Sequence, residues 1–164
     1  MSEIPQRLAA KPSWLVTQLS VHVRRLVSDG FATAGARGYH YRILAALAEF
    51  GPLSQAELGR RCRVDRSDVV AAVNQLAEAC YAERTPDPNH GRRNIVQLTK
   101  AGARQVKRLD KVLDEVQDEL MAPLSGAERE TFVRLLGRVL AAQESAVPPG
   151  ASSPVRGQRG CENR

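Results

Sequence analysis

The sequence is poor in aromatic residues and in cysteine. Aromatic residues make up 4% of its 164 residues, with Trp14 as the single tryptophan, so the chain has little material for a stacking platform that binds single-stranded nucleic acid. The three cysteines, Cys62, Cys80 and Cys161, are an odd number without CxxC spacing, which argues against a disulfide framework and against a zinc site. We therefore expect neither a structural disulfide nor a bound metal.

Signals for membranes, secretion and catalysis are also missing. No apolar run reaches the roughly 18 residues that a membrane span needs, and residues 1–12 lack the apolar stretch of a secretory signal. The sequence contains no GxSxG nucleophile elbow, no HExxH metal motif and no glycine-rich phosphate loop. We expect a cytoplasmic protein that does not associate with membranes, is not an enzyme and uses no cofactor.

Positive charge, in contrast, is in excess. The 24 lysines and arginines outnumber the 18 aspartates and glutamates and leave a net charge of +6, which attracts polyanions; the shortage of aromatic residues makes a duplex the favoured one. A hydrophobic content of 43% over this length suits a single core. We predict one domain over residues 13–145, between a disordered N-terminus (1–12) and a disordered tail (146–164) rich in Pro, Gly, Ser and Arg.

Apolar residues recur at helical spacing through most of this domain. The pattern predicts a helix over 13–34, a second that ends at Phe50, a third from Ser54 to about Cys62, a fourth that follows a cap at Asp65, a fifth from a cap at Thr99 to the break at Pro123, and a sixth from Ser125. Ser54 with Glu57, and Ser125 with Glu128, match capping boxes that begin helices. In the fourth helix, the residues predicted to face inward are Val69, Val70, Val73, Leu76 and Ala77.

Two short strands follow the fourth helix. Residues 81–84 and 95–98 fit strands, whereas 86–93 is rich in turn formers and its prolines exclude it from an interior strand. We expect 86–93 to be a basic connection that projects into solvent as a wing. This order of elements predicts a mainly α-helical winged helix-turn-helix with a small β-hairpin over about 38–100, flanked by dimerisation helices at about 13–34 and 100–145.

The exposed face of the fourth helix carries side chains suited to reading base edges. Arg66, Ser67 and Asn74 lie there, and arginine and asparagine can pair bidentately with guanine and adenine in the major groove. Arg92 and Arg93 lie in the predicted connection of the hairpin, where guanidinium groups suit the negative potential of an adjacent minor groove. The alternatives are a solvated charged surface for the arginines and an exposed polar position for Asn74.

The stretch SQAELGRRCRVDRSDVVAAVNQLAEACYAERTPDPNHGRRNIVQLTKAG, from Ser54 to Gly102, resembles the multiple-antibiotic-resistance regulator (MarR) family. The resemblance covers the reader helix, an arginine leading into the wing, a DP turn with paired arginines, and a leucine-threonine before the next helix. It implies a homodimer whose first, fifth and sixth helices interlock, with Arg92 or Arg93 at the wing tip in the minor groove and Arg84 bracing the wing base. The predicted DNA-contacting residues are Gln55, Arg63, Arg66, Ser67, Asn74, Arg84, His90, Arg92 and Arg93.

Two positions depart from the family pattern. Cys80 stands where the family generally has glycine, and a side chain on a left-handed residue there costs roughly 1 kcal/mol. His90 replaces the aspartate that usually precedes the wing-tip arginines, so the carboxylate that braces them is missing. As thiols, Cys62 and Cys80 are interpreted as small apolar fillers rather than reactive groups.

The fifth and sixth helices are too apolar for a small winged lobe to bury, which implies a partner surface. The residues predicted to form the dimer are Leu15, Leu19, Leu120, Phe132, Leu136 and Leu140. The alternative is that these helices fold back on their own lobe. A twofold dimer would present two reader helices to a pseudo-palindromic site, and by analogy with the family we expect repression.

Aromatic and cationic residues gather near the predicted junction of the first and second helices. A small anionic aromatic ligand would suit Trp14, His22, Arg25, Tyr39, His40 and Arg42, and it would release DNA by favouring a dimer geometry that fits the operator poorly. The alternative is that the histidines and the tryptophan are structural. A second function class also stays open, namely a winged-helix module that binds protein or RNA without sequence-specific DNA binding.

Overall fold

The computed structural model describes residues 4–88 and 90–146, with only the backbone described at 90–93. Contacts within the chain divide it into two compact units, Met1–Leu120 and Met121–Arg164. The boundary lies inside the single domain predicted over 13–145, and that domain assignment stays a prediction. Among the described residues, no helix is long and apolar enough to cross a membrane.

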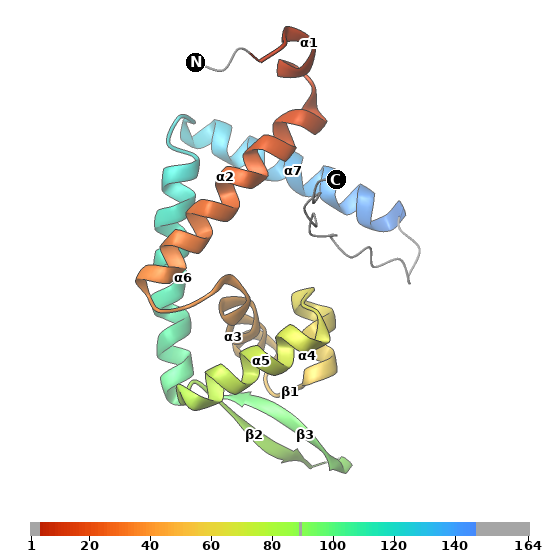
Figure 1. Ribbon diagram of the computed structural model, residues 1–164, viewed down its shortest axis with the longest axis vertical. Helices are drawn as coiled ribbons and strands as arrows, with labels where there is room; N and C mark the ends of the chain where they lie inside the picture. Colours follow the sequence, from red (N-terminus) through yellow and green to blue (C-terminus); the bar gives the residue numbers. More distant parts are fainter. Residues whose placement is uncertain (1–3, 89, 147–164) are drawn as a thin grey trace, which may run out of the picture. The chain divides into compact units, whose positions relative to one another are not determined.

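The first unit contains a three-stranded sheet and the helices that precede and follow it (Figure 1). Its elements are α1 (Gln6–Ala9), α2 (Pro12–Thr33), α3 (Gly38–Phe50), β1 (Leu53–Ser54), α4 (Gln55–Cys62), α5 (Arg66–Glu78), β2 (Ala82–Asp87), β3 (His90–Leu98) and α6 (Lys100–Leu120). Helices α2 to α6 confirm the first five helices predicted from the sequence. Helix α1 is a correction, because it lies in the segment predicted to be disordered; its 4 residues are too few to show a periodic pattern.

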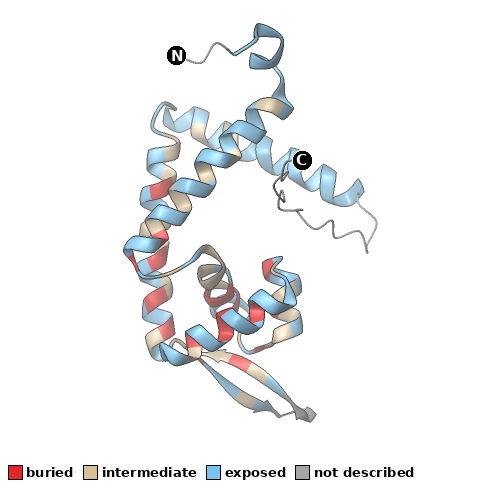
Figure 2. Cartoon of the chain, in the orientation of Figure 1, coloured by how far each residue is buried: buried red, intermediate tan, exposed pale blue. Residues whose placement is uncertain are grey.

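One hydrophobic core joins the helices of this unit to the sheet. Its largest fully buried side chains are Ile43, Leu44, Leu58, Leu109, Val69, Val73 and Val96. They come from α3, α4, α5, β3 and α6 (Figure 2). Burial of each such side chain contributes about 1.5–3 kcal/mol, so the core holds α5 and the hairpin against the same neighbours.

The buried face of α5 differs from the prediction at one valine. Val69, Ala72, Val73 and Leu76 are buried, whereas Val70 is 40% exposed. The buried set follows the i, i+3, i+4, i+7 spacing of one helical face, and Val70 lies off that face. Val70 therefore belongs to the exposed side of α5.

Local hydrogen bonds define the turn between α4 and α5. In the predicted capping box, the Ser54 N–H and hydroxyl donate to the Glu57 carboxylate at 2.9 and 2.6 Å, and the Glu57 N–H donates to Ser54 Oγ at 3.3 Å. The bonds from Ser54 lower the pKa of Glu57. Helix α4 ends where Arg63 takes a left-handed conformation with φ 52°. Asp65 is the N-cap residue of α5, but its side chain makes no capping hydrogen bond, which corrects the predicted mechanism of that cap.

The sheet is antiparallel, with strand order β1-β3-β2. Both hairpin strands exceed 81–84 and 95–98, because Pro86 and Asp87 continue β2 and residues 90–94 begin β3. The predicted strands are therefore too short, whereas the exclusion of the prolines from an interior strand agrees with the structure. Strand β2 lies at the edge of the sheet, where a proline, which has no N–H, is tolerated, and the register shifts between Pro86 and Asp87.

Helix α6 is held against the base of the hairpin by Thr99. Thr99 Oγ1 donates to the Cys80 carbonyl at 2.7 Å and accepts from the Gly102 N–H at 2.9 Å, which confirms Thr99 as the cap of this helix. A Cβ atom at Gly102 would overlap the Tyr81 carbonyl oxygen. Glycine is therefore required where α6 passes the end of the turn that follows α5.

The second unit contains α7 (Gly126–Ala146), the sixth predicted helix. The Glu128 carboxylate accepts hydrogen bonds from the Ser125 N–H at 2.8 Å and the Ser125 hydroxyl at 2.7 Å, and these bonds lower the pKa of Glu128. No residue of α7 is buried. Its exposed large apolar side chains are Val133, Leu135, Leu136, Val139 and Leu140.

Candidate nucleic-acid interface

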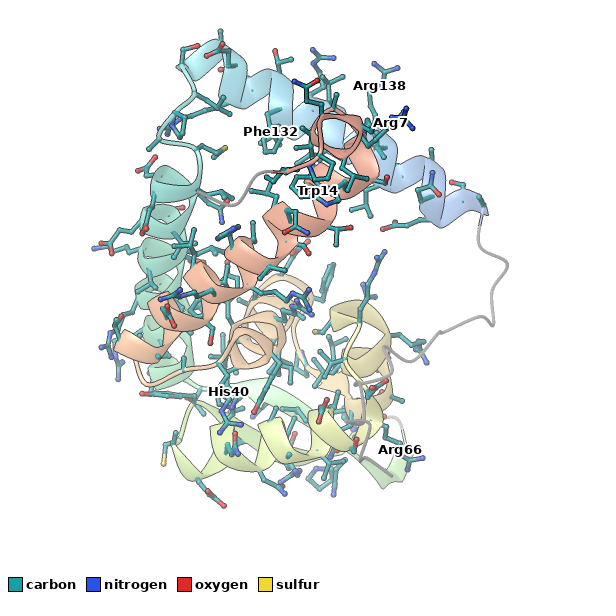
Figure 3. The ribbon with its side chains drawn as sticks, turned by 45° about the horizontal axis from the view of Figure 1, so that its top comes forward. Arg7, Trp14, His40, Arg66, Phe132 and Arg138 are labelled. Carbon is teal, nitrogen blue, oxygen red and sulfur yellow. The ribbon has the colours of Figure 1, made fainter. Side chains whose placement is uncertain are left out.

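The first turn of α5 presents two polar side chains to solvent. Arg66 and Ser67 are exposed, and Figure 3 shows Arg66 pointing away from the lobe at the start of the helix. Neither side chain has a hydrogen bond or ion pair with another residue in the described part of the chain. Val70, one turn later, adds an apolar side chain to this face. The face therefore offers donors, an acceptor and methyl groups that no residue of the lobe uses.

Asn74, in contrast, makes a contact within the lobe. Its Oδ1 accepts a hydrogen bond from Arg84 Nη2 at 2.6 Å, which joins α5 to β2. Bidentate reading of adenine would use the second lone pair of the same oxygen. The bond supplies the kind of brace that the family resemblance implies for Arg84, and it gives Asn74 a role that the sequence pattern did not indicate.

Helix α5, the predicted reader helix, lies beside the base of the β2–β3 hairpin, the predicted wing. Helix α5 packs against β2, and the two long strands run outward from the lobe as a hairpin (Figure 1). The backbone of β3 includes His90, Arg92 and Arg93 in its outer part, while their side chains lie outside the described residues. The helix and the ribbon expected to share one surface are therefore adjacent at their base.

The remaining predicted DNA contacts lie on α4 and in the turn after it. Gln55, the first residue of α4, is half-buried, and Arg63 is exposed in the left-handed turn. The guanidinium of Arg61 lies 4.2 Å from the centre of the Phe50 ring. This cation–π contact could not be predicted from the sequence, because it joins two separate helices and no local spacing indicates it.

The two described cysteines differ in their surroundings. Cys80 has φ 58°, the left-handed conformation expected from its departure from the family's glycine, and it is exposed. The prediction of an apolar filler is therefore wrong for Cys80. Cys62 is buried, as predicted; its Sγ donates to the Arg42 carbonyl at 3.3 Å, and burial raises the pKa of the thiol. No cluster of three or more potential metal ligands occurs in the described part of the chain.

His40 is a structural link between α3 and α5 (Figure 3). The Arg37 N–H donates to His40 Nδ1 at 3.2 Å, so the ring carries its proton on Nε2, which donates to Gln75 Oε1 at 2.8 Å. Desolvation by burial lowers the pKa of His40. The ring of its neighbour Tyr39 packs edge-on against the His40 ring, with 4.8 Å between the ring centroids. The Tyr39 hydroxyl accepts a hydrogen bond from Arg37 Nη1 at 2.6 Å. The structural alternative for His40 is the one that these contacts favour.

The six predicted effector residues differ in their surroundings. Arg25 pairs with Asp29 at 3.5 Å on the exposed side of α2. His22 is exposed and Trp14 is half-buried. Arg42 lines a cavity of about 430 Å³, whose residues are Tyr41, Arg42, Ala45, Ala46, Glu49, Phe50, Arg61, Cys62 and Arg63. The cavity thus joins α3 to the end of α4 and includes only one member of the predicted set.

Tyr41 connects this cavity to α6. Its hydroxyl donates to Asp110 Oδ1 at 2.8 Å, and its ring stacks on the Phe31 ring with 5.4 Å between the ring centroids. Burial, the hydrogen bond to Asp110 and the charges of Asp110 and Asp114 raise the pKa of Tyr41 to about 12. Tyr41 therefore stays protonated and keeps α2, α3 and α6 together.

Comparisons with known proteins bear on this arrangement. A model of the MarR family matches residues 34–93. A protein of Thauera aromatica, assigned as the transcriptional regulator of the hcr operon, is 32% identical over 80% of this chain and 83% of its own length. The chain belongs to the MarR family.

Two further transcriptional regulators resemble the chain. The HTH-type transcriptional repressor NicR of Pseudomonas putida is 31% identical over 63% of this chain and 65% of its own. The crystal structure of the PcaV transcriptional regulator of Streptomyces coelicolor, in complex with its natural ligand, is 28% identical with a TM-score of 0.68 and covers 87% of this chain and 99% of PcaV. The predictions of a winged helix-turn-helix, of DNA-binding regulation and of a non-enzyme are confirmed.

Proposed function

We propose that this MarR-family chain acts in the cytoplasm as a homodimeric, sequence-specific repressor on double-stranded DNA, and that a small anionic aromatic ligand releases it. The observation that carries the proposal is the exposed first turn of α5. There Arg66 and Ser67 have no partner within the described residues, and the same helix is tied through Asn74 to Arg84 at the wing base. Side chains that can contact bases thus lie on a helix whose angle to the wing is fixed.

We propose that the residues that determine DNA-sequence specificity lie mainly in the first turn of α5. The recognition helix of a helix-turn-helix contacts bases with its N-terminal residues, and a bidentate arginine–guanine pair discriminates by about 1–3 kcal/mol. Exposed Val70 can meet a thymine methyl group on the same face. Asn74 then acts by holding Arg84, and the wing residues Arg92 and Arg93 supply the adjacent minor-groove contact.

A second copy of the chain is proposed to cover exposed leucines on α2 and α7. Leu15 and Leu19 are 47% and 37% exposed, and Leu136 and Leu140 are 42% and 57% exposed. Leu120 and Phe132, the other two predicted dimer residues, are half-buried. Concentrations of large exposed apolar side chains mark association surfaces. A twofold dimer would place its reader helices on half-sites about 34–36 Å apart or at a multiple of that distance.

Ligand control is supported by relatives and by one cavity. NicR is a repressor, and PcaV was crystallised with its natural ligand. In the cavity of about 430 Å³, Arg42 and Arg61 lie beside Phe50. Guanidinium groups can pair with a carboxylate, and an aromatic side chain can pack on a planar ring. Trp14, His22, Arg25 and Tyr39 stay predicted effector contacts for which no shared cavity is described.

Fluorescence anisotropy with DNA from upstream of the chain's own gene tests the DNA proposal. We expect Arg66→Ala to weaken binding to this DNA by about 5- to 150-fold, the equivalent of one bidentate contact, with little change on a mixed-sequence duplex. Arg24→Ala, which removes an exposed cation on α2, is the matched control and should leave both affinities unchanged. Equal losses on both duplexes would make Arg66 a phosphate contact, and uniform or absent binding by the wild type would favour the protein- or RNA-binding module.

A further inference from the structure

The exposed residues of α6 are basic in the first half of the helix and acidic in the second half. Its first half carries five exposed cations, Lys100, Arg104, Lys107, Arg108 and Lys111. Their spacing of three and four residues puts them on one side of the helix, opposite the buried Gly102, Gln105 and Leu109. No ion pair joins any of the five to a carboxylate within the residues that the structure describes.

The second half of the same helix is acidic. Its exposed carboxylates are Asp114, Glu115, Asp118 and Glu119. The helix macrodipole favours carboxylates in the first turn and cations in the last, but the first turn of α6 contains no acidic residue and the last turn no basic one. The charge order therefore opposes the dipole and does not serve the stability of the helix. A surface needed only for solubility would have no reason to keep the two signs apart.

The basic half of α6 adjoins the reader helix and the wing. Strand β3 ends at Leu98 and α6 begins at Lys100, and Thr99 between them donates to the carbonyl of Cys80, just after α5. Figure 1 shows α6 leading away from the base of the hairpin. The cations therefore begin beside the two elements proposed to enter the grooves, and the carboxylates lie farther along the helix.

We propose that the basic face of α6 binds phosphates of duplex DNA next to the operator half-site, as a third contact that is independent of base sequence. The inference rests on the proposed DNA-binding function. From Lys100 to Lys111 the face spans about 16 Å at 1.5 Å per residue, and phosphates follow one another at about 3.4 Å of helix axis per strand. Several phosphates can therefore be neutralised together, while the acidic half keeps the other end of α6 away from the polyanion.

The salt dependence of binding to a mixed-sequence duplex of about 40 base pairs, roughly four helical turns, tests the proposal. We compare the wild type with the variant Arg104→Gln, Arg108→Gln, Lys111→Gln; glutamine keeps a good helix propensity. Each phosphate contact contributes about 0.9 to the slope of log K against log salt, so the slope should fall by up to about 2.7. The affinity at 0.1 M salt should fall by about 8-fold for one lost contact and about 500-fold for three.

The control variant is Arg7→Gln, Arg24→Gln, Arg134→Gln, which removes the same net charge from exposed positions on α1, α2 and α7. It should keep the wild-type slope. The thermal midpoint of the α6 variant should be close to that of the wild type, because the three cations are exposed and glutamine keeps a good helix propensity. A wild-type slope in a folded α6 variant, or an equal loss in the control, overturns the proposal and leaves the proposed function standing. A wild type that binds no duplex overturns both, and the single variant Arg108→Gln, with one third of the change, decides the matter should the triple variant not fold.

Discussion

Replacing His40 with alanine should loosen the reader helix from the rest of its lobe. His40 accepts the Arg37 N–H at the start of α3 and donates to Gln75 on α5. Loss of a hydrogen bond that caps a helix start costs about 0.5–2 kcal/mol, and loss of a neutral side-chain hydrogen bond costs about 0.5–1.5 kcal/mol. We expect His40→Ala to lower the free energy of unfolding by about 1–3 kcal/mol.

The same contacts give this stabilisation a pH dependence of defined sign. Desolvation by burial, with a smaller effect of the Arg37 charge, lowers the pKa of His40 from its usual 6.5, although the bond to Gln75 opposes the shift. The folded state favours the neutral ring, so the unfolded chain binds more protons between the two pKa values. The contribution is therefore present above pH 6.5 and is lost as the pH falls from there through the folded-state pKa. Protonation of Nδ1 would remove the acceptor for the Arg37 N–H.

Urea unfolding followed by circular dichroism, at about pH 7.5 and about pH 5.5, measures both effects. The protein concentration is held fixed, since a dimer's stability depends on it. The urea midpoint of the wild type should be lower at pH 5.5 than at pH 7.5. The His40→Ala variant should have a lower midpoint than the wild type at pH 7.5, and its midpoint should decrease less when the pH is lowered. His22→Ala, at an exposed position on α2, is the matched control. Glu57 and Glu128 have pKa values lowered from 4.5. The stabilisation from these carboxylates is therefore lost only as the pH falls below 4.5, outside the range of this measurement. An unchanged midpoint, or a pH dependence that survives in His40→Ala, would refute the reasoning.

Three further predictions follow from single contacts. A double-mutant cycle of Asn74→Ala and Arg84→Ala should give a coupling of about 0.5–1.5 kcal/mol in operator binding, measured by anisotropy; additive effects would show that the bond at 2.6 Å does not act on DNA binding. Cys80→Gly should raise the free energy of unfolding by about 1 kcal/mol because φ is 58°, whereas Ala79→Gly, at φ −78°, should lower it; a gain in both or in neither contradicts the strain. Leu136→Glu should give monomers in light scattering because this leucine is 42% exposed on α7, and a dimer of normal mass would place the interface elsewhere.

Much of the fold could be predicted from local patterns in the sequence. The helical spacing of apolar residues and the two serine–glutamate boxes located the helices, because both signals act within one or two turns. The length of the wing was mispredicted, because whether Pro86 can sit in a strand depends on the strand being at the edge, which is a property of the assembled sheet. Val70 was misassigned since both valines of the Val69–Val70 pair fit an apolar stripe, and packing decides which one is buried.

The candidate site was less predictable than the fold. Exposure of Arg66 and Ser67 follows from their place opposite the apolar stripe of α5. The pairing of Asn74 with Arg84 does not, because it joins a helix to a strand and depends on where β2 passes. The predicted effector residues were grouped by chemistry near one junction, but Arg25 pairs with Asp29 and His40 is used between α3 and α5. Residue type alone could not separate these uses.

The two links to the reader helix act on consecutive residues. Arg84 on β2 binds Asn74, and His40 on α3 binds Gln75, so α5 is tied on two sides in its second half. Its first turn, with Arg66 and Ser67, has no such side-chain link in the described part of the chain. The start of the helix is positioned instead by buried Val69 and by the turn at Arg63, and Arg63 also lines the cavity that contains Arg42. We therefore propose that a ligand in that cavity acts on the first turn of α5, while the two links keep the angle between α5 and the wing.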